Sequence, residues 1–94
     1  MNTTHQPPPI NESRRVYSQL AIRRDVINII ADLSDTNPDH VTPERELADL
    51  GLESLDFVEM IVEIEKKWNL SFTDSEMERI KTVGDCIAHV QRYS

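Results

Sequence analysis

Apolar residues recur at helical spacing in two long stretches of this chain. Over about residues 13–33 they follow one another at intervals of three and four, which predicts a helix with one buried face. That face contains Ile22, Val26, Ile29, Ile30 and Leu33. Residues 54–68 repeat the spacing and predict a second helix. Its core face contains Phe57, Met60, Ile61, Ile64 and Trp68.

Two start signals predict the remaining helices. Thr73-Asp-Ser-Glu76 has the form of a capping box, in which a hydroxyl and a carboxylate satisfy free amides, so a short helix should span about residues 74–80. Thr82-Val-Gly-Asp85 repeats the signal before a last helix that contains Val83, Cys86, Ile87 and Val90. No stretch alternates convincingly as a strand would. The expected fold is all-α, a small antiparallel four-helix bundle of three main helices and one short helix.

Prolines and glycines mark the segments outside these helices. Residues 1–12 combine three consecutive prolines with polar residues, so we expect a disordered or extended lead-in before one domain over residues 13–94. Between Ser34 and Glu53, the residues Pro38, Pro43 and Gly51 interrupt any helical pattern and predict a long loop. A loop of this length usually serves a function.

A second apolar stripe runs along the helix predicted over residues 54–68. It consists of Leu55, Val58 and Val62, interleaved with Asp56, Glu59 and Glu63. An apolar stripe edged by acids is typical of a surface that docks another protein. The same pattern suits a small bundle that wraps its central helix on both sides, and the sequence leaves both interpretations open.

Composition narrows the choice of partners and location. The chain has 94 residues, 38% of them hydrophobic, which is enough for one modest core. A formal net charge of -7 opposes binding to nucleic acid or to an anionic membrane. There is no run of about 18 apolar residues for membrane insertion, and the first residues lack the apolar core of a secretory signal. We therefore expect a soluble protein of the cytoplasm. We also expect it to be a monomer on its own.

Several kinds of active site are excluded by residue counts. The one cysteine, Cys86, rules out an internal disulfide and a multi-thiolate zinc site, and we expect it in the core. With Gly51 and Gly84 as the only two glycines, the chain has neither a phosphate-binding loop nor a dinucleotide fingerprint. The three histidines are far apart, and no serine or cysteine stands in a nucleophile motif. The sequence does not indicate an enzyme.

One acidic segment has the spacing of a calcium-binding loop. Asp35, Asn37, Asp39 and Glu46 match positions one, three, five and twelve of an EF-hand. Against this, His40 stands where the loop needs glycine, and Pro38 and Pro43 restrict the backbone. No second loop is present for pairing. A polar loop interrupted by proline is the preferred interpretation, and we expect no bound metal.

A second segment places a serine at the start of a helix. In Asp49-Leu-Gly-Leu-Glu-Ser-Leu-Asp56, Ser54 marks the change from irregular to helical pattern. The free amides and positive dipole end of a helix start favour a phosphate esterified to such a serine. Taken alone this is weak, because a serine here is more often only a helix cap.

Two ordered motifs add to this local chemistry. Leu50-Gly-Leu-Glu-Ser-Leu-Asp56 and Ile80-Lys-Thr-Val-Gly-Asp85 resemble the two signatures of the acyl carrier protein family, and the resemblance runs from about Val16 to Val90. It implies that Ser54 bears a covalent 4'-phosphopantetheine. One departure is Glu53, where the family usually has aspartate, and it bears on which transferase accepts the chain.

The resemblance also implies a function. A phosphopantetheinyl transferase, which uses magnesium, would transfer the arm from coenzyme A to Ser54. The chain would then act as a freestanding carrier, without catalysis, and shuttle acyl thioesters between enzymes of fatty-acid or polyketide-like biosynthesis. Aminoacyl cargo stays open. Alternative functions are an unmodified helical adaptor that docks through its acidic helix and a calcium-binding helical module.

The acidic helix indicates where partner enzymes would bind. From Glu53 to Glu65 there are five acids and no basic residue. Such a surface is steered onto basic patches and released again, as a shuttle requires. We expect acyl-transferring and condensing enzymes to dock on Glu53, Leu55, Asp56, Val58, Glu59, Val62 and Glu63.

A further hypothesis concerns the acyl cargo. Six apolar residues on or after the second helix could line a cleft for it: Met60, Ile61, Ile64, Phe72, Met77 and Ile80. Flexible methionines adapt to variable shapes. Most of these residues are also suited to ordinary core packing, which is the preferred interpretation.

Overall fold

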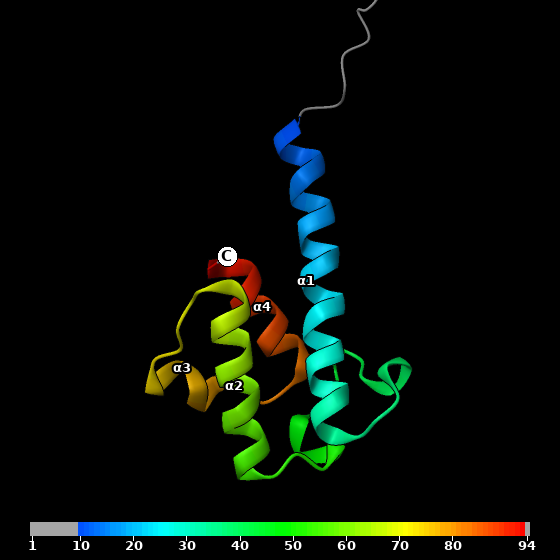
Figure 1. The fold of residues 1–94 in the computed structure, drawn as a ribbon, viewed down its shortest axis with the longest axis vertical. Coiled ribbons are helices and arrows are strands. Elements are labelled where there is room, and N and C mark those ends of the chain that lie inside the picture. The colour runs from blue at the N-terminus through cyan, green and yellow to red at the C-terminus, as the bar shows by residue number, and fades with distance from the viewer. Residues whose placement is uncertain (1–9, 94) are drawn as a thin grey trace, which may run out of the picture.

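The computed structural model describes residues 10–93, and side chains over residues 18–93. Its elements are α1 (Ile10–Ser34), η1 (Pro38–His40), η2 (Leu47–Leu50), α2 (Ser54–Trp68), α3 (Asp74–Arg79) and α4 (Val83–Tyr93). Figure 1 shows α1 running opposite to α2 and α4, with the short α3 on the far side of α2. The predicted all-helical bundle is confirmed. Within residues 10–93, extended pairing is limited to one antiparallel bridge between Glu46 and Thr82.

The first helix is longer than its apolar face predicts. It begins at Ile10, directly after the last of three prolines, and three residues before the expected start at Ser13. Nothing between Ile10 and Ser13 breaks a helix. Residues 1–9 of the predicted lead-in lie outside the described residues. The helix ends at Ser34, after which Asp35 adopts a positive φ of 54°.

The second helix has the predicted bounds and the predicted core face. Met60, Ile61 and Ile64 are buried, and the two flanking aromatic residues, Phe57 and Trp68, pack partly buried against the core. Asn69 ends the helix in the left-handed conformation, with φ at 54°. This is a usual way to terminate a helix, because it redirects the chain while the last carbonyls stay bonded.

Both predicted capping boxes are present. The Thr73 hydroxyl accepts from the Glu76 N–H at 3.1 Å, and the Glu76 carboxylate accepts from the Thr73 N–H at 2.9 Å. Thr82 and Asp85 make the same reciprocal pair at 3.1 and 3.0 Å. The third helix ends at Arg79, one residue earlier than expected, because Ile80 is already extended and turns its side chain into the core.

The core lies where α1, α2 and α4 meet. Its fully buried large side chains are Ile30, Met60, Ile64, Val26, Val41, Val83, Val90 and Cys86. The Cys86 sulfur lies 3.9 Å from the Met60 sulfur. Burial raises the pKa of the Cys86 thiol to about 12, so it packs as a neutral residue. The expectation that Cys86 belongs to the core is confirmed.

The long loop between α1 and α2 is fixed to the start of α4. Leu47 N–H donates to the Lys81 carbonyl at 2.9 Å, and Gly84 N–H donates to the Pro43 carbonyl at 2.8 Å. A Cβ at position 84 would lie 3.1 Å from that same Pro43 oxygen. Glycine therefore allows the loop and α4 to approach this closely. The side chains of Val41, Leu47 and Leu50 anchor the loop in the core.

Candidate functional site

Ser54 is the first residue of α2, and its side chain is exposed. The preceding turn positions it. Gly51 ends η2 with a positive φ of 81°, which a residue with a side chain adopts only under strain. Leu47 and Leu50 are buried on the inner side of that turn. The chain thus enters α2 from a fixed point, with Ser54 on the outside.

Ser54 is not the residue that caps α2. Glu53 holds the cap position with an extended backbone (φ -87°, ψ 172°). Its N–H donates to the Asp56 carboxylate at 3.1 Å. The hydroxyl of Ser54 is therefore not required to hold the helix end. The sequence left open whether this serine is merely a cap, and the structure assigns that position to its neighbour.

The start of α2 favours a negative group attached to Ser54. The first amides of a helix have no carbonyl partner within it, and the aligned peptide dipoles make this end positive. Stabilisation of an exposed anion here amounts to about 0.3–1 kcal/mol at low salt. A phosphodiester on Ser54 would receive this stabilisation.

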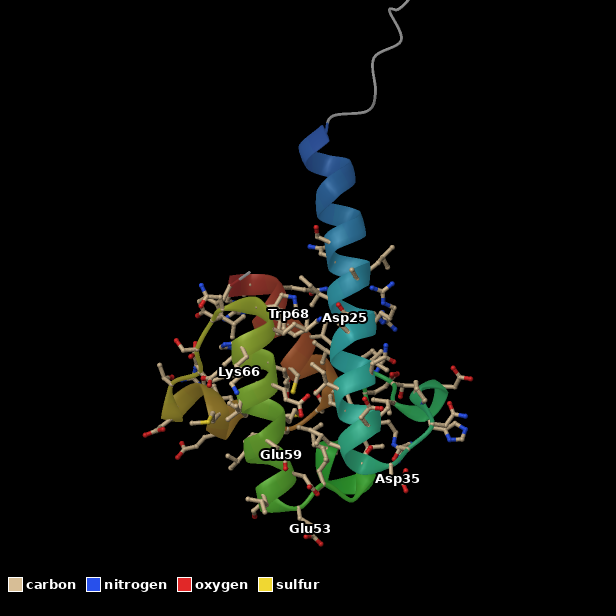
Figure 2. The ribbon with its side chains drawn as sticks, in the orientation of Figure 1. Asp25, Asp35, Glu53, Glu59, Lys66 and Trp68 are labelled. Atoms are coloured by element: carbon tan, nitrogen blue, oxygen red, sulfur yellow. The ribbon has the colours of Figure 1, made fainter. Side chains whose placement is uncertain are left out.

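The predicted docking stripe is open to solvent. The exposed fractions are 74% for Leu55, 55% for Val58 and 40% for Val62. No other element of the described chain wraps this side of α2. The acids Glu53, Glu59 and Glu63 are exposed beside the stripe, whereas Asp56 is half-buried because its carboxylate caps the helix. Figure 2 shows Glu53 and Glu59 near the end of the molecule where α2 begins.

A pocket of about 410 Å³ lies beside Ser54. Its lining residues are Glu46, Leu47, Ala48, Leu52, Glu53, Ser54, Phe57, Val58, Ile80 and Lys81. The walls are mostly apolar and come from η2, α2 and the segment between α3 and α4. Of the six residues expected to line a cargo cleft, only Ile80 lies here. Met60 and Ile64 are fully buried in the core.

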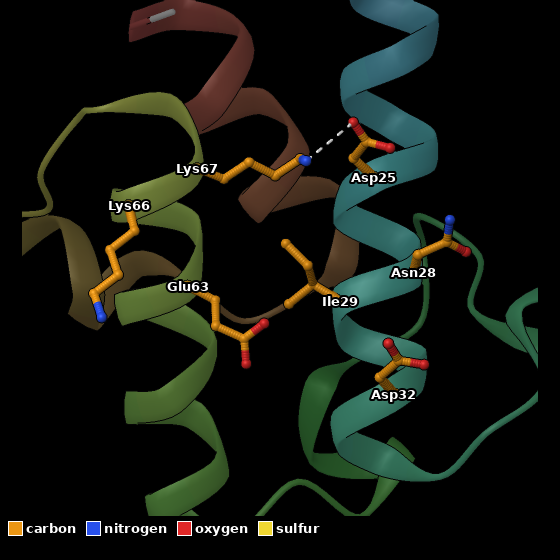
Figure 3. Close-up of a pocket in the computed structure, with 7 residues that line it drawn as sticks. All are labelled: Asp25, Asn28, Ile29, Asp32, Glu63, Lys66 and Lys67. Atoms are coloured by element: carbon orange, nitrogen blue, oxygen red, sulfur yellow. Dashed lines mark ion pairs between the residues drawn. The ribbon is translucent and has the colours of Figure 1, made fainter.

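A second groove, of about 490 Å³, lies between α1 and α2. Figure 3 shows that the Asp25 carboxylate faces the Lys67 ammonium across this groove, at 3.8 Å. Lower in the groove the Glu63 carboxylate points toward Ile29 of α1. Both charge signs line the groove, and Glu63 belongs to it as well as to the acidic side of α2.

The four residues with calcium-loop spacing do not enclose a site. Asp35 follows the last residue of α1, and the Asn37 side chain accepts from the Asp39 N–H at 2.8 Å, which caps η1. The backbone of Glu46 pairs with that of Thr82 in an antiparallel bridge. Over the described residues, no three His, Cys, Asp or Glu side chains gather as metal ligands would. The geometry gives the calcium interpretation no support.

Comparison with known proteins decides the family. A family model described as a phosphopantetheine attachment site matches residues 24–90. The acyl carrier protein of Wolinella succinogenes is 36% identical over 73 residues, which cover 77% of this chain and 96% of that protein. The chain belongs to the acyl carrier protein family.

Further relatives agree with this assignment. The acyl carrier protein of Helicobacter pylori strain J99 is 37% identical over 77% of this chain and 94% of its own length. The solved structure of the Enterococcus faecalis acyl carrier protein matches with a TM-score of 0.71 at 26% identity, over 81% of this chain and 98% of that one. As an acyl carrier protein, the chain bears a covalent 4'-phosphopantetheine and carries acyl groups without catalysing their conversion.

Sequence reasoning missed most of the pocket beside Ser54. Leu47, Ala48 and Leu52 stand in the proline-interrupted loop, and Lys81 stands between two helices. A weak signal was available, since apolar residues at positions 47, 50 and 52 are unusual in an exposed loop. The pairing of this loop with residues near Lys81 has no local sequence signature.

None of the described helices combines the length and apolarity needed to cross a bilayer.

Proposed function

We propose that Ser54 is the residue that carries the 4'-phosphopantetheine arm. The observation that carries the proposal is an exposed hydroxyl at the first residue of α2, inside the matched family region, whose capping role is taken by Glu53. A transferase would attach the arm by attack of the Ser54 oxygen on the β-phosphorus of coenzyme A. The phosphoanhydride bond breaks, adenosine 3',5'-bisphosphate leaves, and the serine proton passes to a base of the transferase.

The acidic side of α2 supports a docking role in the same cycle. Exposed Leu55, Val58 and Val62 supply apolar contact area, and the flanking acids supply long-range attraction. Partner enzymes with basic patches around an active-site entrance would bind here, which places the arm on Ser54 at that entrance. Condensing and acyl-transferring enzymes are the expected partners, and the cytoplasm is the expected location.

The resident arm determines what the chain can do chemically. Its terminal thiol holds the acyl group as a thioester, and its flexible length keeps that group at high local concentration near a docked active site. Fatty-acid, polyketide-like and aminoacyl pathways are all compatible with this chemistry. An unmodified adaptor is the rival function, since it would use the same acidic surface without Ser54.

The test is intact-mass spectrometry of the apo protein, with coenzyme A and a broad-specificity phosphopantetheinyl transferase. We expect a gain of one phosphopantetheine on the wild type and on Ser75→Ala, an exposed serine of α3, and none on Ser54→Ala. A gain that persists in Ser54→Ala contradicts the assignment.

A slow reaction of the wild type would be traced with Glu53→Asp. Faster loading of that variant would show that the longer carboxylate restricts the transferase. Failure of both proteins to load with any transferase, while partner enzymes still bind α2, would favour the adaptor.

A further inference from the structure

The amino-terminal half of α1 extends beyond the bundle. Figure 1 shows it reaching past the ends of α2 and α4. Among the described side chains of α1, burial begins only at Ile22, whereas Ser18, Gln19 and Leu20 are exposed. Leu20 is 58% exposed. Most helical stability in proteins comes from tertiary packing, so this half gains stability from any surface that covers it.

Charge is distributed unevenly between this helix and the rest of the chain. Residues 14–24 contain four of the ten basic residues and no acid. Arg23 and Arg24 are exposed, and the Arg24 side chain, 69% exposed, pairs with its neighbour Asp25 at 3.3 Å. Residues 53–65 contain five acids and no base. The chain is therefore strongly bipolar.

The two charged regions lie toward opposite ends of an elongated molecule. In Figure 1, α1 spans nearly the whole length of the described part of the molecule. In Figure 2, Glu53 and Glu59 lie toward the end opposite to the projecting half of α1. Two copies placed antiparallel would bring the basic residues 14–24 of each α1 onto the acidic side of the other copy's α2. Such a dimer is symmetric and closed: its two contacts are equivalent, and neither copy has a free complementary surface for a third copy.

The two surfaces also match in their apolar content. The acidic side of α2 exposes Leu55, Val58 and Val62, and the basic half of α1 exposes Leu20. A lipid surface fits less well, since the net charge of -7 repels anionic headgroups from the rest of the molecule. A second copy supplies both the complementary charge and an apolar stripe.

We propose that two copies of this chain associate antiparallel, with residues 14–24 of α1 of each copy on the acidic side of α2 of the other. The contact is weak and depends on ionic strength, so dilute protein at high salt is the monomer expected from the sequence. One consequence rests on the proposed function: the contact covers the surface where enzymes dock, so self-association and delivery compete. Self-association itself needs no arm on Ser54.

Sedimentation velocity of the apo protein tests the proposal at about 0.01 M and about 0.3 M salt, where the screening length falls from about 30 Å to well under 10 Å. We expect a dimer at low salt that dissociates at high salt. Arg23→Glu with Arg24→Glu, and separately Glu59→Lys with Glu63→Lys, should each weaken the dimer at least about tenfold. These four side chains are exposed, so folding should persist, which circular dichroism checks.

Mixing the two charge-reversed proteins is the decisive step. In a mixed dimer, the reversed α1 of one protein faces the reversed α2 of the other, and the second contact joins two unchanged surfaces. Both contacts then have opposite charges, so a heterodimer should form. Arg79→Glu with Arg92→Glu makes the same change in net charge on exposed residues of α3 and α4 and should leave the dimer intact.

Monomeric wild type at low salt overturns the proposal, as does a mixture that stays monomeric or equal weakening by the control pair. Co-sedimentation with phosphatidylglycerol vesicles, without self-association, would overturn it in favour of a lipid surface.

Discussion

The Asp85 carboxylate accepts hydrogen bonds from the backbone N–H groups of Thr82 and Lys81, at 3.0 and 2.9 Å, while the Thr82 hydroxyl accepts from the Asp85 N–H at 3.1 Å. Partial burial would raise the pKa of Asp85, but these hydrogen bonds outweigh it and hold the pKa below its ordinary value. These hydrogen bonds stabilise the start of α4, and they are strongest when the Asp85 carboxylate is ionised.

The first prediction concerns this cap. Asp85→Ala should lower the free energy of unfolding at neutral pH by about 0.5–1 kcal/mol, the low part of the range for cap residues because the carboxylate is partly solvent-screened. Since the folded-state pKa is depressed, the stabilisation is complete above the unfolded-state value of about 3.9 and is lost as the pH falls through the lower folded-state pKa. Urea unfolding at several pH values should show the difference narrowing at low pH. A difference that stays constant to pH 2, or equals that of exposed Glu78→Ala, would refute the cap.

The second prediction concerns Gly84. A Cβ here would lie 3.1 Å from the Pro43 carbonyl oxygen, which is itself held by the Gly84 N–H at 2.8 Å. Gly84→Ala should therefore destabilise the fold by about 1–3 kcal/mol, despite the better helix propensity of alanine. Thermal unfolding measures the loss. An unchanged or raised Tm would mean that the loop yields without cost.

The third prediction concerns docking on α2. Glu59→Lys with Glu63→Lys should lower kcat/KM for transfer to partner enzymes at least about tenfold, chiefly through slower association, and leave the Tm nearly unchanged. The matched control is Glu44→Lys with Glu78→Lys, which makes the same charge change at exposed positions outside α2. Equal loss in both variants would assign the effect to net charge. No loss in either would remove the acidic side of α2 from the docking surface.

The fourth prediction concerns the pocket beside Ser54. If an acyl chain enters it, burial of about three methylene groups at about 0.8 kcal/mol each should raise the Tm of the loaded protein by about 10–20 °C over the form with a free thiol. Ala48→Phe should fill the pocket and abolish this gain. Ala88→Phe, at an exposed position of α4, should retain it. Equal gains in both variants would place the acyl chain elsewhere.

Short-range signals predicted most of this fold. The capping boxes at Thr73 and Thr82 and the core face of α2 follow from residues within a few positions of one another. The pocket could not be predicted in this way, because Leu47 and Lys81 are distant in sequence and meet through a backbone hydrogen bond that any side chain permits. The start of α1 was predicted three residues late, at Ser13, because none of residues 10–12 gives a recognisable start signal.

For the site, the sequence predicts that Ser54 carries the arm and that partner enzymes dock on α2, and it left two questions open. Whether Ser54 serves only as a cap was answered by the backbone of Glu53, and whether Val58 is wrapped was answered by its exposure of 55%. Both answers depend on which elements pack nearby. A helical pattern alone contains no information about which of its two stripes remains uncovered.

The bonds that tie Pro43 and Leu47 to the start of α4 also determine when the turn before Ser54 becomes ordered. The loop is synthesised well before α4, yet its partners at Lys81 and Gly84 belong to the last part of the chain to be made. A nascent chain that has exposed α2 but not α4 would present the serine on an unanchored turn. A transferase that reads the shape of this turn would therefore act only on chains that have finished folding, which protects the supply of coenzyme A from unfinished products.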